Sequence, residues 1–325
     1  MATYKGIQGY SVQKLATDPT ASEAVGQLWY NSTSGKFKVG TSGGGSWSSG
    51  TVINTARRYL SGVGSKTAGL IFGGNAPGLN YTESYDGTTW TEVADTTDAG
   101  MTQRGRAGTQ TAALAGGGAN GGTKDYSESW NGTAWTEVNA MVAATSAGAS
   151  FGVQTAAIVS GGSAPATNTA SETWDGTCWT EGTNINNGRN SCAGCGIVTA
   201  GLMFGGTPPI ATLGDLSESY DGTSWTITNN LNVGRYGISG SGTQDAGMAY
   251  GGGTPPQSAL TELFDGTSWT EVGDLATARR WAGSSTVTGT DSAFLAGGLI
   301  APGASSNLTE EWTNPVYTIK TVTVS

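Results

Sequence analysis

Short apolar runs that end in a pair of glycines recur along the chain, as in Gly69-Leu70-Ile71-Phe72 and Gly201-Leu202-Met203-Phe204. A continuous apolar run of this length is typical of a strand buried on both faces. Glycines at its end permit a close approach of neighbouring backbones. The pairs recur at intervals of 44 to 46 residues and are Gly73-Gly74, Gly117-Gly118, Gly161-Gly162, Gly205-Gly206, Gly251-Gly252 and Gly297-Gly298.

A second pattern follows each glycine pair. In the first copy it reads Glu83-Ser84-Tyr85-Asp86-Gly87 and then Trp90, an alternating strand, a tight turn and a further strand. Each repeat therefore predicts four strands, near 59–65, 67–72, 81–85 and 89–93 in the first. The tryptophans in this position are Trp90, Trp135, Trp179, Trp225 and Trp269, and Glu310-Glu311-Trp312 with Tyr317 is a degenerate sixth copy.

A repeat of this length that joins four short strands indicates a propeller blade. The order of apolar run, Gly-Gly, aromatic residue and tryptophan resembles the Kelch repeat. The resemblance implies an all-β, six-bladed Kelch-like β-propeller with four-stranded antiparallel blades over residues 46–325. The aromatic residue stands only five positions before the tryptophan, closer than in the usual Kelch repeat.

Three closures of the ring fit the sequence. Trp47 precedes Arg57-Arg58 at the spacing that separates Trp269 from Arg279-Arg280, so an N-terminal strand could complete the last blade. The tail 316–324 alternates β-branched residues and places Tyr317 in the tryptophan position. A partial seventh blade built from Phe37–Val39 and Trp47 is the third arrangement.

Residues 1–45 lie outside the repeat, and a Gly/Ser-rich stretch over 41–49 separates most of them from it. Gly26–Val39 predicts a β-hairpin. Its phrase Gly-Gln-Leu-Trp-Tyr-Asn resembles segments of phage virion proteins such as tail fibres and other appendages. The resemblance implies a virion structural protein, located on the phage particle, whose N-terminal segment attaches to other virion proteins. The propeller would then contact a host surface glycan or receptor or serve particle assembly.

Composition narrows the function further. The net charge of −9 gives no basic surface for nucleic acid, and no apolar stretch is long enough for membrane insertion. Histidine is absent, which removes the commonest general base and metal ligand. We therefore expect that the protein is not an enzyme and that it binds no cofactor or metal ion. No heptad pattern indicates a coiled coil, so a homo-oligomer would rest on the N-terminal segments or on propeller faces. Cys192 and Cys195 are expected to be small core residues.

Two features leave ligand binding open, and a lectin-like propeller without catalysis is the alternative function. The repeated glutamates of the second pattern could pair with arginines between the repeats, or those arginines could form a cationic rim around the central channel. The tryptophans could fill the core or stack on sugars, and loops 74–80, 207–215 and 254–259 could supply ligand contacts. The arginines are Arg57, Arg58, Arg104, Arg106, Arg189, Arg235, Arg279 and Arg280.

Overall fold

The computed structural model describes residues 12–20, 24, 26–42, 45–75, 80–163, 168–207, 214–253, 256–286, 289–314 and 317–322. The chain forms two compact units: unit 1 is Met1–Gly45 with Asn314–Ser325, and unit 2 is Ser46–Thr313. The division between residues 45 and 46 is the one that the sequence predicts. The assignment of the tail to the propeller is wrong, because its strand pairs with a strand of unit 1.

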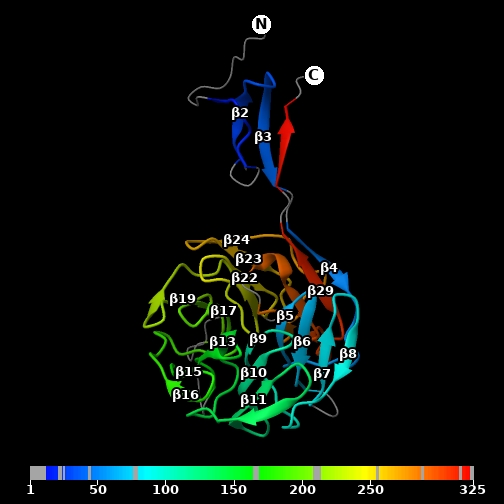
Figure 1. The fold of residues 1–325 in the computed structure, drawn as a ribbon, viewed down its shortest axis with the longest axis vertical. Helices are drawn as coiled ribbons and strands as arrows, with labels where there is room; N and C mark the ends of the chain where they lie inside the picture. Colours follow the sequence, from blue (N-terminus) through cyan, green and yellow to red (C-terminus); the bar gives the residue numbers. More distant parts are fainter. Residues whose placement is uncertain are drawn as a thin grey trace. The chain divides into compact units, whose positions relative to one another are not determined.

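Unit 2 contains six four-stranded antiparallel sheets, each built from one repeat except for the last. Figure 1 shows them arranged in chain order around a common centre. The first three are β5 (Ser61–Ser65), β6 (Ala68–Phe72), β7 (Thr82–Tyr85) and β8 (Trp90–Val93); β9 (Gly105–Gly108), β10 (Ala113–Ala119), β11 (Thr123–Trp130) and β12 (Trp135–Val138); and β13 (Ala149–Val153), β14 (Ala156–Ser160), β15 (Ser171–Trp174) and β16 (Trp179–Glu181).

The remaining three sheets continue this order around the ring. They are β17 (Ala193–Ile197), β18 (Ala200–Phe204), β19 (Ser217–Tyr220) and β20 (Trp225–Ile227); β21 (Ser239–Gly242), β22 (Gly247–Tyr250), β23 (Thr261–Phe264) and β24 (Trp269–Glu271); and β25 (Gly283–Ser284), β26 (Phe294–Ala296), β29 (Thr309–Thr313) and β4 (Ser46–Gly50). The innermost strands β5, β9, β13, β17, β21 and β25 contact one another in sequence, and β25 contacts β5. This arrangement is a β-propeller.

The apolar runs form the second strand of each sheet, and their side chains fill the space between neighbouring sheets. Phe72 on β6 packs against Trp135 of the next sheet at 4.8 Å between ring centroids, and Phe204 packs against Trp269 at 5.0 Å. Both phenylalanines are fully buried. Burial on both faces explains why these runs lack the alternation of a half-exposed strand.

The glycine pairs lie where consecutive sheets approach each other. Gly205 and Gly206 both have positive φ, and the Gly206 N–H donates to the Arg235 carbonyl of the next sheet at 2.8 Å. A Cβ on Gly205 would lie 2.9 Å from that carbonyl oxygen. The equivalent bond recurs at the other five pairs, so these glycines supply both the left-handed conformation and the space for the contact.

The last sheet is completed from the other end of the chain. Strand β4 pairs with β29, and Trp47 lies opposite Trp312. Of the three closures that the sequence permits, the N-terminal strand is the one formed. The tail fails as the closing strand because β30 (Tyr317–Thr321) pairs with β3 (Lys36–Ser42) instead. Phe37–Val39 and Trp47 fall into different sheets, so they form no joint blade.

Unit 1 contains a four-stranded sheet in the order β1 (Gln13–Leu15), β2 (Leu28–Asn31), β3 and β30. The predicted hairpin is confirmed, because β2 and β3 pair in antiparallel register. Trp29 is 2% exposed, and its indole N–H donates to Asp18 at 3.0 Å. The described residues thus form seven four-stranded sheets where the repeats predict six. The seventh is this one, whose β1–β2 pair is parallel.

Little regular structure besides these sheets occurs in the described residues. A two-stranded hairpin, β27 (Leu299–Ile300) with β28 (Ala304–Ser305), and a 3₁₀ turn, η1 (Thr290–Ser292), both lie in the last repeat. Across the described part of the chain, no helix has the length and apolar character needed to span a membrane.

Candidate axial site

Five of the arginines proposed for a cationic rim are instead buried in ion pairs. Arg235 pairs with Glu262 at 2.8 Å, and both side chains are at most 1% exposed. The same glutamate accepts the backbone N–H of Asn232, in the segment that joins two sheets. The ion pair therefore fixes this connection against a strand of the sheet that follows it. The other pairs are Arg57–Glu83, Arg104–Glu128, Arg189–Glu218 and Arg279–Glu310.

Two repeats depart from this arrangement. The carbonyls that accept the glycine-pair bonds belong to Arg57, Arg189, Arg235 and Arg279 in four repeats, but to Met101 and Thr145 in the second and third. In the second repeat, Arg104 enters from three residues further along the chain and still reaches Glu128. Arg104 is one of the arginines that the sequence offers as partners of the repeated glutamates, and this pairing is formed.

The third repeat has a glutamate but no arginine. Glu172 accepts the backbone N–H groups of Val142 and Ala143, each at 2.8 Å. Burial raises the pKa of its carboxyl, against the effect of these two hydrogen bonds.

The repeated tryptophans lie between sheets. Trp135 and Trp179 are each 5% exposed, and their indole N–H groups donate to Thr82 and Ser127 of the preceding sheet at 3.0 Å. Trp90, Trp225 and Trp269 are equally buried. Their faces are covered by protein atoms, so they offer no surface for sugar stacking.

A cycle of hydrogen bonds surrounds the centre of the ring. Six residues, one from each repeat, donate their backbone N–H to the carbonyl of the residue before them in the cycle, at 2.7 to 3.0 Å. All six have φ between 54° and 60°, the left-handed region. The residues are Tyr59, Gln103, Ala147, Ser191, Gly237 and Trp281, and the cycle closes because Tyr59 donates to Trp281.

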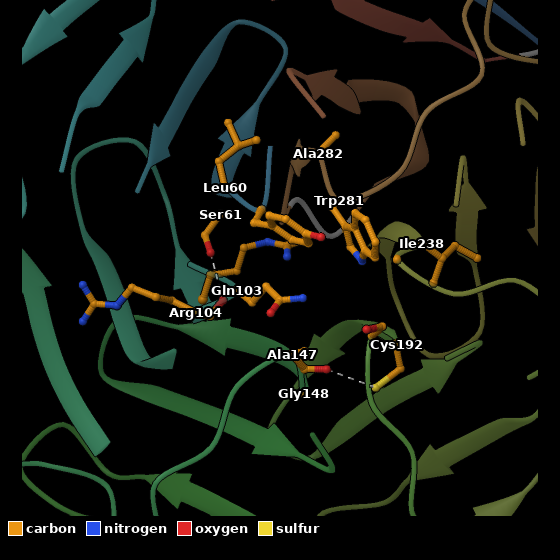
Figure 2. A pocket seen from close by; sticks show the side chains of 14 residues that line it. Leu60, Ser61, Gln103, Arg104, Ala147, Gly148, Cys192, Ile238, Trp281 and Ala282 are labelled. Atoms are coloured by element: carbon orange, nitrogen blue, oxygen red, sulfur yellow. Dashed lines mark hydrogen bonds between the residues drawn. The ribbon is translucent and has the colours of Figure 1, made fainter. Parts of the chain in front are cut away.

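The six residues of the cycle have equivalent backbone conformations but six different side chains. A left-handed conformation costs an L-residue about 1–2 kcal/mol, and Gly237 has no such cost. The other five are the only non-glycine residues with positive φ in the described chain. Large residues on one side and small ones on the other leave a cavity of about 60 Å³, which all six line (Figure 2).

Arg106 also lines this cavity. It lies on β9, and its Nη2 donates to the Ser284 hydroxyl on β25, two sheets away around the ring. Its Nε is buried without a hydrogen-bond partner. Unlike the five buried arginines above, it takes part in none of the ion pairs of the described residues.

Aromatic and cationic side chains cluster beside the cavity. The Arg280 guanidinium lies 4.1 Å from the Trp281 ring centroid and 4.8 Å from that of Tyr236. Tyr59 packs on Trp281 at 4.4 Å, and Arg58 lies 5.7 Å from the Tyr59 ring. Burial raises the pKa of the Tyr59 hydroxyl. We call these five residues the rim cluster; Arg58 and Arg280 are two of the arginines named for a cationic rim, whose part in binding stays a prediction.

The cysteines show no sign of a functional pair. Cys192 and Cys195 are buried free thiols, and burial raises their pKa to about 11 and about 12. Cys192 lines the cavity, where its thiol contacts the Ala147 carbonyl at 3.9 Å (Figure 2). Within the described residues, no group of three His, Cys, Asp or Glu could hold a metal ion.

The three loops proposed for ligand contacts fall partly outside the described residues, since 76–79, 208–213 and 254–255 are not described. Their part in binding stays a prediction. The cavity and its rim cluster are the candidate site that the described residues support.

Comparison with known proteins informs only the fold. No protein-family model matches the chain, and no curated protein matches it. Membership of the Kelch family therefore stays a prediction. Among solved structures, that of YjhT aligns with a TM-score of 0.69 and 14% sequence identity, over 83% of this chain and 99% of YjhT. At this identity the likeness shows the β-propeller fold alone.

Proposed function

We propose that this chain is a phage virion structural protein in which unit 1 attaches to the particle and unit 2 presents a rigid, non-catalytic surface. Unit 2 is, in this proposal, a closed Kelch-like ring of six blades, and the seventh sheet belongs to the attachment unit. The cycle of six backbone hydrogen bonds supports this count. The surface would serve host contact or particle assembly.

The pairing of β3 with β30 is the observation that carries the proposal. It joins both parts of the chain that flank the repeats into one sheet, so the propeller is inserted in unit 1 and the chain passes between the units twice. Two covalent connections suit a protein that must hold a rigid domain on a particle. The hairpin β2–β3 contains the phrase that resembles phage appendage proteins.

The internal construction of unit 2 supports a scaffolding role. The repeated glutamates hold the connections between sheets, and the repeated tryptophans fill the spaces between them. The most regular residues of the sequence are thus engaged in structure. The irregular residues, at the cavity and the rim cluster, remain for recognition.

Particle association tests the proposal. Quantitative mass spectrometry and gold-labelled antibodies on purified particles from the source should find the chain at one defined position with a symmetric copy number. Absence from particles would overturn the virion role.

The contribution of unit 1 can be tested with two neighbouring substitutions. Trp29→Ala removes the buried indole that contacts Asp18 and should abolish incorporation into particles. Leu28→Ala, at a side chain 39% exposed, should leave incorporation unchanged. Equal incorporation of both variants would argue against attachment through this sheet.

The rim cluster favours a second function, a lectin-like propeller that binds carbohydrate without catalysis. The half-buried side chains of Tyr59, Tyr236 and Trp281 beside two arginines are suited to sugars that carry acidic groups. Saturable binding in a glycan array, lost in Tyr236→Ala and retained in an exposed control such as Tyr126→Ala, would establish it. A chain that is absent from particles and binds glycans would replace the virion role by this one.

A further inference from the structure

The axial cavity holds a positive charge for which the described residues provide no counterion. Arg106 lines it, while the carboxylates that neutralise the five fully buried arginines lie elsewhere. Burial lowers the pKa of the Arg106 guanidinium, but arginine stays charged at neutral pH. The side chain is half-buried, and a charge that is partly withdrawn from water is normally paired or solvated.

Two residues that line the cavity carry hydrogen-bond donors without partners. The indole Nε1 of Trp281 and the Nε of Arg106 are both buried and have no hydrogen-bond partner, and both residues line the cavity. No carboxylate side chain is among the residues that line it. A site that offers donors and a cation selects an anion.

Volume limits the size of that anion. About 60 Å³ holds a few water molecules, since one water molecule requires roughly 10–15 Å³. A carboxylate group fits within it, whereas a whole sugar ring does not. The planar guanidinium matches a carboxylate in geometry as well as in charge.

The left-handed residues give an independent reason to expect a ligand. Gly237 demonstrates that a residue without a side chain can occupy a place in the cycle. The other five places keep side chains at an expense of about 1–2 kcal/mol each. Strain of this kind concentrates at binding sites.

We propose that the axial cavity binds a carboxylate group, with Arg106 as its counterion and the Trp281 indole N–H as a second donor. The carboxylate belongs either to a free small organic acid or to an acidic sugar whose ring stays outside the cavity. This proposal is independent of particle attachment, because every residue that it uses lies in unit 2.

Titration calorimetry on the full chain at pH 7 and constant ionic strength tests the proposal, with acetate and glucuronate as the probes. Acetate should bind saturably to the wild-type protein. Binding of acetate alone would identify a free small acid as the ligand class, and binding of both would identify an acidic sugar. The absence of saturable binding of either probe would overturn the proposal.

Substitutions assign the binding to Arg106. Arg106→Met should weaken acetate binding by about 10- to 100-fold, the effect of losing a charged hydrogen-bond partner. Arg58→Met removes the same charge from the rim cluster, at a residue that does not line the cavity, and should change the affinity less than about twofold. Equal losses in the two variants would show that binding reflects general surface charge and would refute the site.

A second readout does not depend on the folding of the Arg106 variant. In the wild-type protein, the indole N–H resonance of Trp281, assigned with Trp281→Phe, should shift in proportion to acetate occupancy. The resonance of Trp29, which lies in unit 1 and donates to Asp18, should not move. A stationary Trp281 resonance under saturating acetate would place the ligand elsewhere.

Discussion

The backbone arrangement repeats six times both in the connections between sheets and in the axial cycle. The two regions differ in whether the residue types repeat as well. In the connections, the same chemistry recurs, and five of six glutamates receive a buried arginine. In the cycle, six equivalent left-handed positions hold six different residues. Where backbone and residue repeat together, the residue serves the architecture; where only the backbone repeats, the residue is free to serve recognition.

The contrast is clearest between Arg104 and Arg106, which are two positions apart. Arg104 is buried against Glu128, and its guanidinium belongs to the repeated network. Arg106 has no equivalent in the other repeats and contacts a serine two sheets away around the ring. The following experiments test the distinction between the network and the cycle.

The largest effect is expected from breaking one network pair. Arg235→Leu leaves Glu262 buried without its cation and should lower the free energy of unfolding by about 3–5 kcal/mol. Guanidinium denaturation followed by tryptophan fluorescence reports unit 2, because every tryptophan except Trp29 lies there. The double variant with Glu262→Leu should lose less. A single variant no worse than the double would contradict the structural role of the pair.

An intermediate effect on the free energy of unfolding is expected from two substitutions in the axial cycle, which should act in opposite directions. Gly237→Ala should lower the free energy of unfolding by about 1–2 kcal/mol, since its Cβ would also lie 2.5 Å from the Trp281 Nε1. Ala147→Gly should raise the free energy of unfolding by about 0.5 kcal/mol. Glycine removes the cost of the left-handed conformation in the folded state, and this gain exceeds the stabilisation of the unfolded chain by its greater conformational entropy. Effects of the same sign at both positions would disprove the equivalence of the cycle positions.

A gain of about 1 kcal/mol is expected from repairing the third repeat. Thr145→Arg places an arginine where four other repeats have one, near the buried Glu172. Because burial raises the folded-state pKa of Glu172, its carboxyl favours folding most when protonated, and this contribution is lost as pH rises through the folded pKa. The gain should therefore be larger at pH 7 than at pH 4, with Thr145→Met as the uncharged control. A gain independent of pH would exclude pairing with Glu172.

The smallest effect is expected from removing the tail. Deletion of residues 314–325 removes β30 from unit 1 but leaves the β4–β29 pairing of unit 2 intact. The unfolding transition of unit 2 should shift by less than about 0.5 kcal/mol. Deletion of Ser46–Gly50, which removes β4, should destabilise unit 2 strongly. Comparable effects of the two deletions would show that the tail contributes to the ring.

Much of unit 2 could be predicted because its local signals agree. Asp86-Gly87 specifies a tight turn, and Asp86 caps it by accepting the backbone N–H groups of Thr88 and Thr89 at 2.8 Å. Such contacts span two or three residues, so they are visible in the sequence. Arg104 reaches Glu128 although it stands three positions after the place of the other paired arginines, because a long side chain can reach one carboxylate from two backbone positions.

The sequence by itself determined the four-stranded repeat, the glycine approaches and the hairpin in unit 1, since each rests on periodicity or on turn chemistry over a few residues. Only the tertiary structure decided which strand completes the last sheet, which of the arginines form ion pairs with the repeated glutamates and which side chains enclose the cavity. Those outcomes depend on contacts between residues as distant as Trp47 and Trp312 or Arg106 and Ser284. Several pairings satisfy the same local pattern, and packing around the closed cycle selects among them.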